Sequence, residues 1–264
     1  MNKIKTIIYK EWAQVFKNRL ILFSVAFMPL LFTAIPLIML FTLRGGEGNA
    51  QGLTADLPPQ FSKFCQEGLS PTECFQVYTV NQFMLLFMMT PLIIPVNIAA
   101  YSVVGEKTTH SLEPLLATPI STMELLVGKN LAAALPAIIA TWIYFIIYIV
   151  GAWLIVQSPH VVGALLDPMW WLAVGVTGPL LAVLSVNFAL MISSRVNEPR
   201  VAEQLSAVVI LPLLALFIGQ VAGLFLINRS LVLLFSLVVL VLDIILVNLA
   251  SRLFQREIIL TRWK

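Results

Sequence analysis

The stretch GEKTTHSLEPLLATPIS, residues 105–121, is a polar interruption in an otherwise apolar chain. Upstream of it, no charged residue occurs between Glu73 and Glu106, and downstream none occurs between Lys129 and Asp167. About 20 apolar residues are enough for a helix to cross the hydrocarbon core of a bilayer. The sequence therefore predicts two membrane spans joined by a short polar connection.

The composition of the whole chain agrees with a lipid environment. Of the 264 residues, 59% are hydrophobic and only 11% are charged, and the mean hydropathy is +0.95. A soluble domain carries about 25% charged residues. The net charge of +3 is small and the basic residues form no stripe, which argues against a nucleic-acid partner. We predict an integral membrane protein.

The fold predicted from these patterns is an all-α membrane protein forming one transmembrane domain over residues 1–264. A short interfacial or re-entrant segment is expected near residues 161–166, because Ser158-Pro159-His160 interrupts the third apolar run. Six stretches have the length of a membrane span, namely Leu20–Leu43, Val80–Val104, Leu131–Val156, Trp170–Ser193, Leu205–Ile227 and Leu231–Ser251.

The distribution of basic residues predicts the orientation. Thirteen of the 16 lysines and arginines flank the spans on one side, and only Arg44, Lys63 and Arg229 lie on the other. Since cytoplasmic flanks are enriched in Lys and Arg, both termini are expected in the cytoplasm of a multi-pass cell-membrane protein. Residues 44–79 then form an external loop, and residues 105–121 form a cytoplasmic one.

Residues 1–18, before the first span, have the spacing of a basic amphipathic helix. Such a helix suits the cytoplasmic headgroup layer, and the alternative is an ordinary charged flank of the first span. Lysines, Glu11, Gln14 and Asn18 occupy the polar positions, and the apolar positions are Ile4, Ile7, Ile8, Trp12, Val15 and Phe16.

No catalytic, cofactor or metal site is predicted. The two histidines, His110 and His160, are expected on opposite sides of the membrane, so they cannot share a metal ion. The segment VGKN, residues 127–130, lacks the upstream glycine and the following Ser or Thr of a phosphate-binding loop, and we interpret it as a helix flank.

Two further features concern single residues. Cys65 and Cys74 lie in the predicted external loop, where disulfides persist, so a bridge between them is predicted, with two free thiols as the alternative. Asp243 is the one carboxylate deep inside a predicted span. It is expected to be a structural anchor rather than a substrate or ion contact, with hydrogen bonds to Asn187, Gln220 or Asn248.

Within the opening stretch the pattern predicts a short helix with an apolar face. Ser111 can cap it, and Pro119 ends it by forcing Thr118 out of helical geometry. A capping box, Ser121 to Glu124, then begins the next helix. An exposed apolar face on a segment held between two rigid membrane spans indicates a protein partner. That face consists of Leu112, Leu115 and Leu116.

These segments resemble a known family. The stretch GEKTTHSLEPLLATPISTMELLVGK (105–129) is similar to the loop between the second and third spans of type-2 ABC transporter permeases, where a coupling helix docks on a separate ATPase. SSRVNEPRVAEQ (193–204) resembles the second cytoplasmic loop, FQREIILTRWK (254–264) the C-terminal tail, and residues 1–18 the elbow helix. The ATPase-coupling residues that the resemblance implies are Glu106, Ser111, Leu112, Glu113, Leu115, Leu116, Thr118 and Pro119.

The resemblance implies the membrane subunit of an ATP-driven exporter that has no ATPase site of its own. It implies a second permease subunit, in a homodimer or a heterodimer, and two cytoplasmic ABC ATPase subunits that bind ATP and magnesium. One alternative is a secondary transporter driven by an ion gradient, which needs charged pairs inside the membrane. Another is a membrane scaffold or signalling subunit that docks a cytoplasmic partner without transport.

Overall fold

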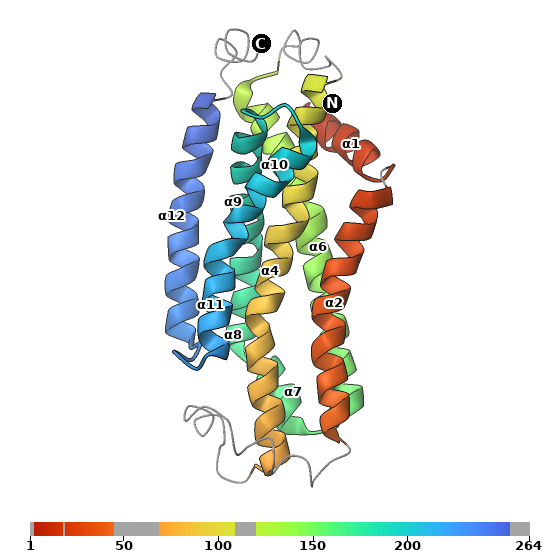
Figure 1. Cartoon of the computed structure of the whole chain (residues 1–264), viewed down its shortest axis with the longest axis vertical. Coiled ribbons are helices and arrows are strands. Elements are labelled where there is room, and N and C mark those ends of the chain that lie inside the picture. Colours follow the sequence, from red (N-terminus) through yellow and green to blue (C-terminus); the bar gives the residue numbers. More distant parts are fainter. Residues whose placement is uncertain (1–2, 18, 45–68, 109–119, 254–264) are drawn as a thin grey trace.

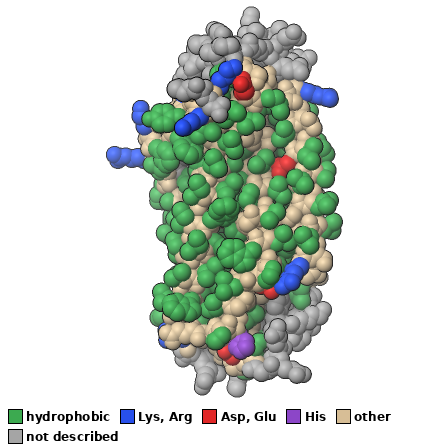
Figure 2. All heavy atoms as spheres, turned by 180° about the vertical axis from the view of Figure 1, so that it is seen from behind, with side chains coloured by type: hydrophobic (Ala, Val, Ile, Leu, Met, Phe, Trp, Pro, Cys, Tyr) green, Lys and Arg blue, Asp and Glu red, His purple; other side chains and the backbone are tan. Residues whose placement is uncertain are grey.

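The computed structural model describes residues 3–17, 19–44, 69–108 and 120–253. These residues form an elongated bundle of helices, with no strand among them (Figure 1). Six helical segments in the described part are long and apolar enough to cross a membrane, as predicted. Hydrophobic side chains cover much of the surface in Figure 2, which is the surface expected of a multi-pass membrane protein.

The first half of the chain contributes four long or amphipathic helices. They are α1 (Lys3–Val15), α2 (Arg19–Arg44), α4 (Pro71–Thr108) and α6 (Thr122–Val156). The second half of the chain is divided into more and mostly shorter helical segments. It comprises α7 (Pro159–Leu165), α8 (Pro168–Trp171), the π-helix η2 (Leu172–Thr177), α9 (Gly178–Ser193), α10 (Pro199–Ser206), the 3₁₀-helix η3 (Ala207–Ile210), α11 (Leu211–Val221) and α12 (Arg229–Leu253).

Helix α4 is the centre of the bundle. Of its most apolar stretch, 78% is buried, against 22% for α2, α6 and α12, and it contacts α2, α6 and α9 extensively. With 38 residues it is about 57 Å long, well beyond the roughly 30 Å of a hydrocarbon core. The helix is therefore longer than one crossing of the apolar layer requires.

The two ends of the bundle differ. At one, here called the α1 end, α1 lies beside the last turns of α4 and the first turns of α6 (Figure 1). At the other, the α7 end, α7 packs beside the start of α4. The turn between α11 and α12 lies toward this second end (Figure 1).

The core changes in character along the bundle. Toward the α7 end it contains stacked and edge-on aromatic rings from Phe87, Phe145, Tyr148 and Trp170. Toward the α1 end it is rich in alanine, including Ala99, Ala133, Ala134, Ala137, Ala182 and Ala189. Small side chains let membrane helices approach closely, so α4, α6 and α9 pack tightly there.

Several helix boundaries differ from the predicted ones. Helix α4 begins at Pro71, inside the predicted external loop 44–79, and runs to Thr108, inside the predicted loop 105–121. Its start is stabilised by reciprocal bonds between Ser70 and Glu73, at 3.1 Å and 3.3 Å. Hydropathy does not detect such a capping box, because both residues are polar.

The fourth and fifth spans were predicted with shifted ends. The fourth forms a broken helical path from Pro159 to Ser193, and its first piece, α7, occupies the predicted interfacial segment. The fifth extends from Pro199 to Val221, whereas residues 205–227 were predicted. Pro199 begins α10, and Gly223, with a φ of 72°, follows the end of α11 in a conformation that favours glycine.

Candidate functional site

Helix α1 packs closely on the first turns of α6. Gly128 makes this approach possible, because a Cβ atom at that position would lie 2.9 Å from the Cγ2 atom of Ile7. One turn further along α1, the indole Nε1 of Trp12 donates a hydrogen bond of 2.9 Å to the carbonyl oxygen of Ala132. Helix α1 is thus joined to α6 by both packing and hydrogen bonding.

Charged side chains from three helices meet at this contact. Lys129 on α6 lies 3.0 Å from Glu11 Oε1 on α1 and 2.9 Å from Glu106 Oε2 on α4. The Lys129 ammonium also donates to the Ser102 hydroxyl at 2.6 Å. Lys10 on α1 donates to Glu106 Oε1 at 2.6 Å. These five residues are called the ion cluster below.

The ion cluster is almost entirely shielded from solvent. The side chains of Lys129, Glu106 and Glu11 are 2%, 3% and 4% exposed, and only Lys10, at 37%, reaches the surface. Two ammonium groups balance two carboxylates. A buried charge that loses its partner is strongly destabilising, so the balance fixes α1, α4 and α6 relative to one another.

A second polar contact extends this junction to α9. The Asn130 amide donates 3.1 Å bonds to Asn187 Oδ1 on α9 and to the Leu126 carbonyl within α6. At the surface of the same end, Lys3 and Glu124 form a longer ion pair of 3.4 Å. That pair is 47% and 33% exposed, so it contributes little to stability.

The junction adjoins the segment that connects α4 to α6. Glu106 lies two residues before the end of α4, and Lys129 lies seven residues after the start of α6. The ion cluster bridges these two helix ends, and it ties both to α1. The described residues include no group of three His, Cys, Asp or Glu side chains that could hold a metal ion.

The predicted ATPase-coupling residues are placed only in part. Glu106 lies in the ion cluster, with its carboxylate turned into the protein. The predicted capping box is confirmed: Glu124 N donates to Ser121 Oγ at 3.2 Å, and Ser121 N donates to Glu124 Oε2 at 2.8 Å. The remaining coupling residues lie outside the described part of the chain, namely Ser111, Leu112, Glu113, Leu115, Leu116, Thr118 and Pro119.

The predicted disulfide falls partly outside the described residues. Cys74 is buried in the first turn of α4, at 1% exposure, whereas Cys65 lies in the undescribed segment 45–68. The bridge stays a prediction.

Asp243 is buried on α12, at 5% exposure, but it lacks the predicted anchor. Neither carboxylate oxygen has a hydrogen-bond partner among the described residues. The Asn187 side chain is engaged with Asn130 and with the Val183 carbonyl. Gln220 donates instead to the Asn81 carbonyl at 3.4 Å. The predicted hydrogen bonds from these amides are therefore wrong, because both side chains face α4 or α6 partners.

Sequence reasoning missed the other charged members of the ion cluster. Lys129 was interpreted as a helix flank, and Glu11 was assigned to the polar face of the N-terminal helix. The structure buries Glu11 together with Ile7 and Val15 on one side of α1. A usable signal was present, because Lys129 follows Gly128 inside an apolar helix, where an unpaired charge is costly.

Comparison with known proteins identifies the family. The family model described as "ABC-2 family transporter protein" matches residues 5–232. No curated protein matches the chain. The matched range includes all of the ion cluster and most of the six membrane-spanning segments. The chain therefore belongs to the ABC-2 family of transporter proteins, whose members are membrane subunits of ABC transporters.

Proposed function

We propose that this chain is the permease subunit of an ATP-driven exporter. In this proposal two cytoplasmic ABC ATPase subunits bind ATP and magnesium, and a second permease subunit, identical or different, completes the translocation path. Membership of the ABC-2 family supports the association with an ATPase. The transported substrate crosses between permease helices, and this chain performs no hydrolysis itself.

The observation that carries the proposal is the position of the ion cluster. It joins α1, α4 and α6 at the two helix ends that flank residues 109–119. A segment that is moved by a partner protein transmits the movement only if it is rigidly attached to the membrane helices, since a flexible attachment would absorb the movement locally. The cluster supplies that stiffness at the α1 end.

The proposed mechanism follows from this connectivity. ATP binding closes the two ATPases, and the apolar face of Leu112, Leu115 and Leu116 moves with them. The ion cluster makes α1 and the adjoining ends of α4 and α6 move as one body. Because α4 is the central helix, its displacement reaches the packed core, where interfaces switch between discrete arrangements.

The orientation belongs to the same proposal. The α1 end faces the cytoplasm, because the chain's lysines and arginines concentrate in the flanks at that end. The α7 end, and with it Cys74 in the first turn of α4, then faces outward.

The buried charges do not favour an ion-gradient-driven transporter. The carboxylates of the ion cluster are already paired with lysines, and they lie near helix ends rather than at mid-span. Asp243 is the one other buried carboxylate among the described residues. A relay of protons or cations requires several such groups along a path.

The docking step is tested by replacing Leu115 and Leu116 with serine. Each buried leucine at an interface contributes about 1.5–3 kcal/mol. The double variant therefore loses about 3–6 kcal/mol and is expected to bind the ATPase roughly hundreds to tens of thousands of fold more weakly. The measurement is copurification of the ATPase with the permease, together with transport-coupled ATP hydrolysis. Membrane insertion is expected to be unchanged, because no span is altered.

The matched control is Met123→Ser. Met123 is 51% exposed in the first turn of α6, outside the leucine face, so its replacement is expected to leave ATPase binding unchanged. Undiminished association and coupling in the leucine variant would show that residues 109–119 are not the docking element. The exporter proposal would then lose its physical support.

A further inference from the structure

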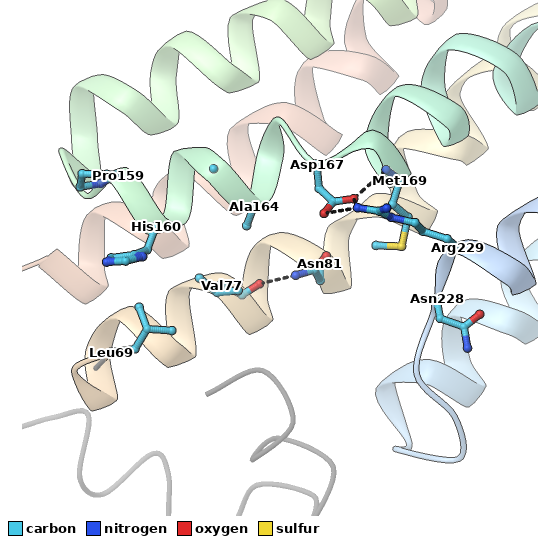
Figure 3. Close-up of a pocket in the computed structure, with 11 residues that line it drawn as sticks. Leu69, Val77, Asn81, Pro159, His160, Ala164, Asp167, Met169, Asn228 and Arg229 are labelled. Atoms are coloured by element: carbon cyan, nitrogen blue, oxygen red, sulfur yellow. Dashed lines mark hydrogen bonds and ion pairs between the residues drawn. The ribbon is translucent and has the colours of Figure 1, made fainter. Parts of the chain in front are cut away.

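A cavity lined by both apolar and charged or polar residues lies at the α7 end, away from the ion cluster (Figure 3). Its volume is about 550 Å³, within the roughly 300–1,000 Å³ of small-molecule sites. It is bounded by the start of α4, by α7 and α8, and by the start of α12. We propose that this cavity binds the headgroup of a zwitterionic phospholipid of the phosphoethanolamine type.

The first argument is the charge pattern of the lining. Asp167 and Arg229 face each other at one end of the cavity, with Arg229 Nη2 at 3.2 Å and 3.1 Å from the two carboxylate oxygens (Figure 3). An anion alone would meet Asp167, and a cation alone would meet Arg229. A ligand that carries an ammonium and a phosphate a few ångströms apart matches both.

The second argument is the supply of hydrogen-bonding groups. Asp167 Oδ1 already accepts a hydrogen bond from Met169 N at 2.8 Å. Asp167 Oδ2 is bonded only to Arg229 among the described residues. Oδ2 can therefore accept a hydrogen bond from an ammonium group. The remaining N–H groups of the Arg229 guanidinium have no partner in the described part of the chain. The Asn228 side chain uses its oxygen to cap α12, by accepting from Leu231 N at 2.8 Å. Its NH₂ group therefore stays available to a phosphate beside Arg229.

The third argument is the position of Arg229 relative to the membrane. Arg229 is the first residue of the α12 span, so it lies where the apolar layer meets the headgroups. Trp171, on α8, is 52% exposed and follows Asp167, the partner of Arg229, by four residues, and tryptophan is enriched at membrane interfaces. The start of α4 and α7 continue beyond this level in Figure 1 and enclose the cavity on the outer side.

The fourth argument is a path for an acyl chain. Leu233 and Leu237 follow Arg229 at intervals of four residues on α12, and so lie on the same side of the helix. They are 55% and 59% exposed. A lipid whose phosphate contacts Arg229 can therefore lay a tail along this apolar strip.

The test measures lipid binding to the purified, full-length protein in detergent, by thermal unfolding and by native mass spectrometry. The probes are short-chain phosphatidylethanolamine, short-chain phosphatidylglycerol and soluble O-phosphoethanolamine. Phosphatidylethanolamine is expected to bind most tightly. Arg229→Gln is expected to weaken that binding by about tenfold or more, because it removes a charge-assisted hydrogen bond. Asn228→Ser retains a capping oxygen and is expected to weaken it by a smaller factor.

The control is Arg44→Gln, since Arg44 lines a separate cavity of about 380 Å³ at the same end. It is expected to leave the affinity unchanged. Equal affinity for phosphatidylglycerol would overturn the zwitterion assignment. Equal affinity for O-phosphoethanolamine would overturn the lipid assignment, and an equal loss in Arg44→Gln would overturn the location. None of these readouts depends on ATP or on an ATPase.

Discussion

At the scale of single residues, Lys129 is the side chain on which the α1 end depends most. It is the one group that contacts both carboxylates of the ion cluster. From the sequence alone it is a lysine near the start of an apolar helix, and such lysines often extend to the headgroups. Its burial follows from the packing of α1 over Gly128, which no local pattern encodes.

We expect Lys129→Met to destabilise the protein by about 3–5 kcal/mol, because it removes the cation that pairs with the buried Glu11 and leaves Glu106 with the partly exposed Lys10 alone. The measurement is the free energy of unfolding in detergent, followed by tryptophan fluorescence. The control Lys3→Met breaks an exposed pair and is expected to cost no more than about 1 kcal/mol.

Neutralising the carboxylates provides a second check on this account. If charge imbalance causes the loss, then Lys129→Met combined with Glu11→Gln and Glu106→Gln is expected to recover much of the stability. A triple variant as unstable as Lys129→Met would instead assign the loss to packing of the lysine side chain.

Asp243 presents the opposite case, a buried carboxylate without a partner among the described residues. An unsatisfied buried polar group costs about 1–3 kcal/mol. Leucine has the same branched shape and the same number of side-chain heavy atoms as aspartate and carries no such cost, so in Asp243→Leu the isolated subunit is expected to keep or increase its unfolding temperature. A clear decrease would contradict this and would mean that the carboxylate has a partner beyond the described residues.

At the scale of elements, the contact between α1 and α6 is set by one glycine. A Cβ at position 128 would lie 2.9 Å and 3.0 Å from Ile7 Cγ2 and Cβ, and the Cβ of Ile7 can move only if α1 moves. Sequence periodicity predicted the α1 helix correctly, but it could not predict which face α6 covers. The buried side includes Glu11. Its charge can be buried because the counter-ion, Lys129, lies on another helix, α6.

Gly128→Ala is therefore expected to lower the unfolding temperature and to reduce transport-coupled ATP hydrolysis. Alanine in a helix is intrinsically favoured over glycine by about 1 kcal/mol, so a decrease can come only from displacement of α1. The matched control is Gly105→Ala on α4, where a Cβ would meet nothing within 4 Å. That variant is expected to be neutral or stabilising, and equal behaviour of the two would refute the proposed contact.

At the scale of the whole molecule, the six spans could be predicted because the hydropathy of a segment depends only on its own residues. The start of α6 could be predicted because the capping box Ser121–Glu124 also involves only residues that are close in the sequence. Sequence patterns could not predict the ion cluster, whose members Glu11, Glu106 and Lys129 come from three helices. They also could not predict that Arg229 pairs with Asp167, because that contact depends on how α8 and α12 pack.

The orientation of the bundle links both proposed sites to their partners. If the α1 end faces the cytoplasm, residues 109–119 can reach an ATPase, and the cavity at the α7 end opens to the outer headgroups. In a variant with both natural cysteines replaced by serine, a cysteine at Gly52 is expected to react with a membrane-impermeant thiol reagent in intact cells. A cysteine at Thr108, the last residue of α4, is expected to react only after permeabilisation. The permeabilised sample is the control for accessibility of position 108. The reverse labelling pattern would place the ion cluster outside, where no ATP-driven partner could act on it, and the coupling proposal would fail as a whole.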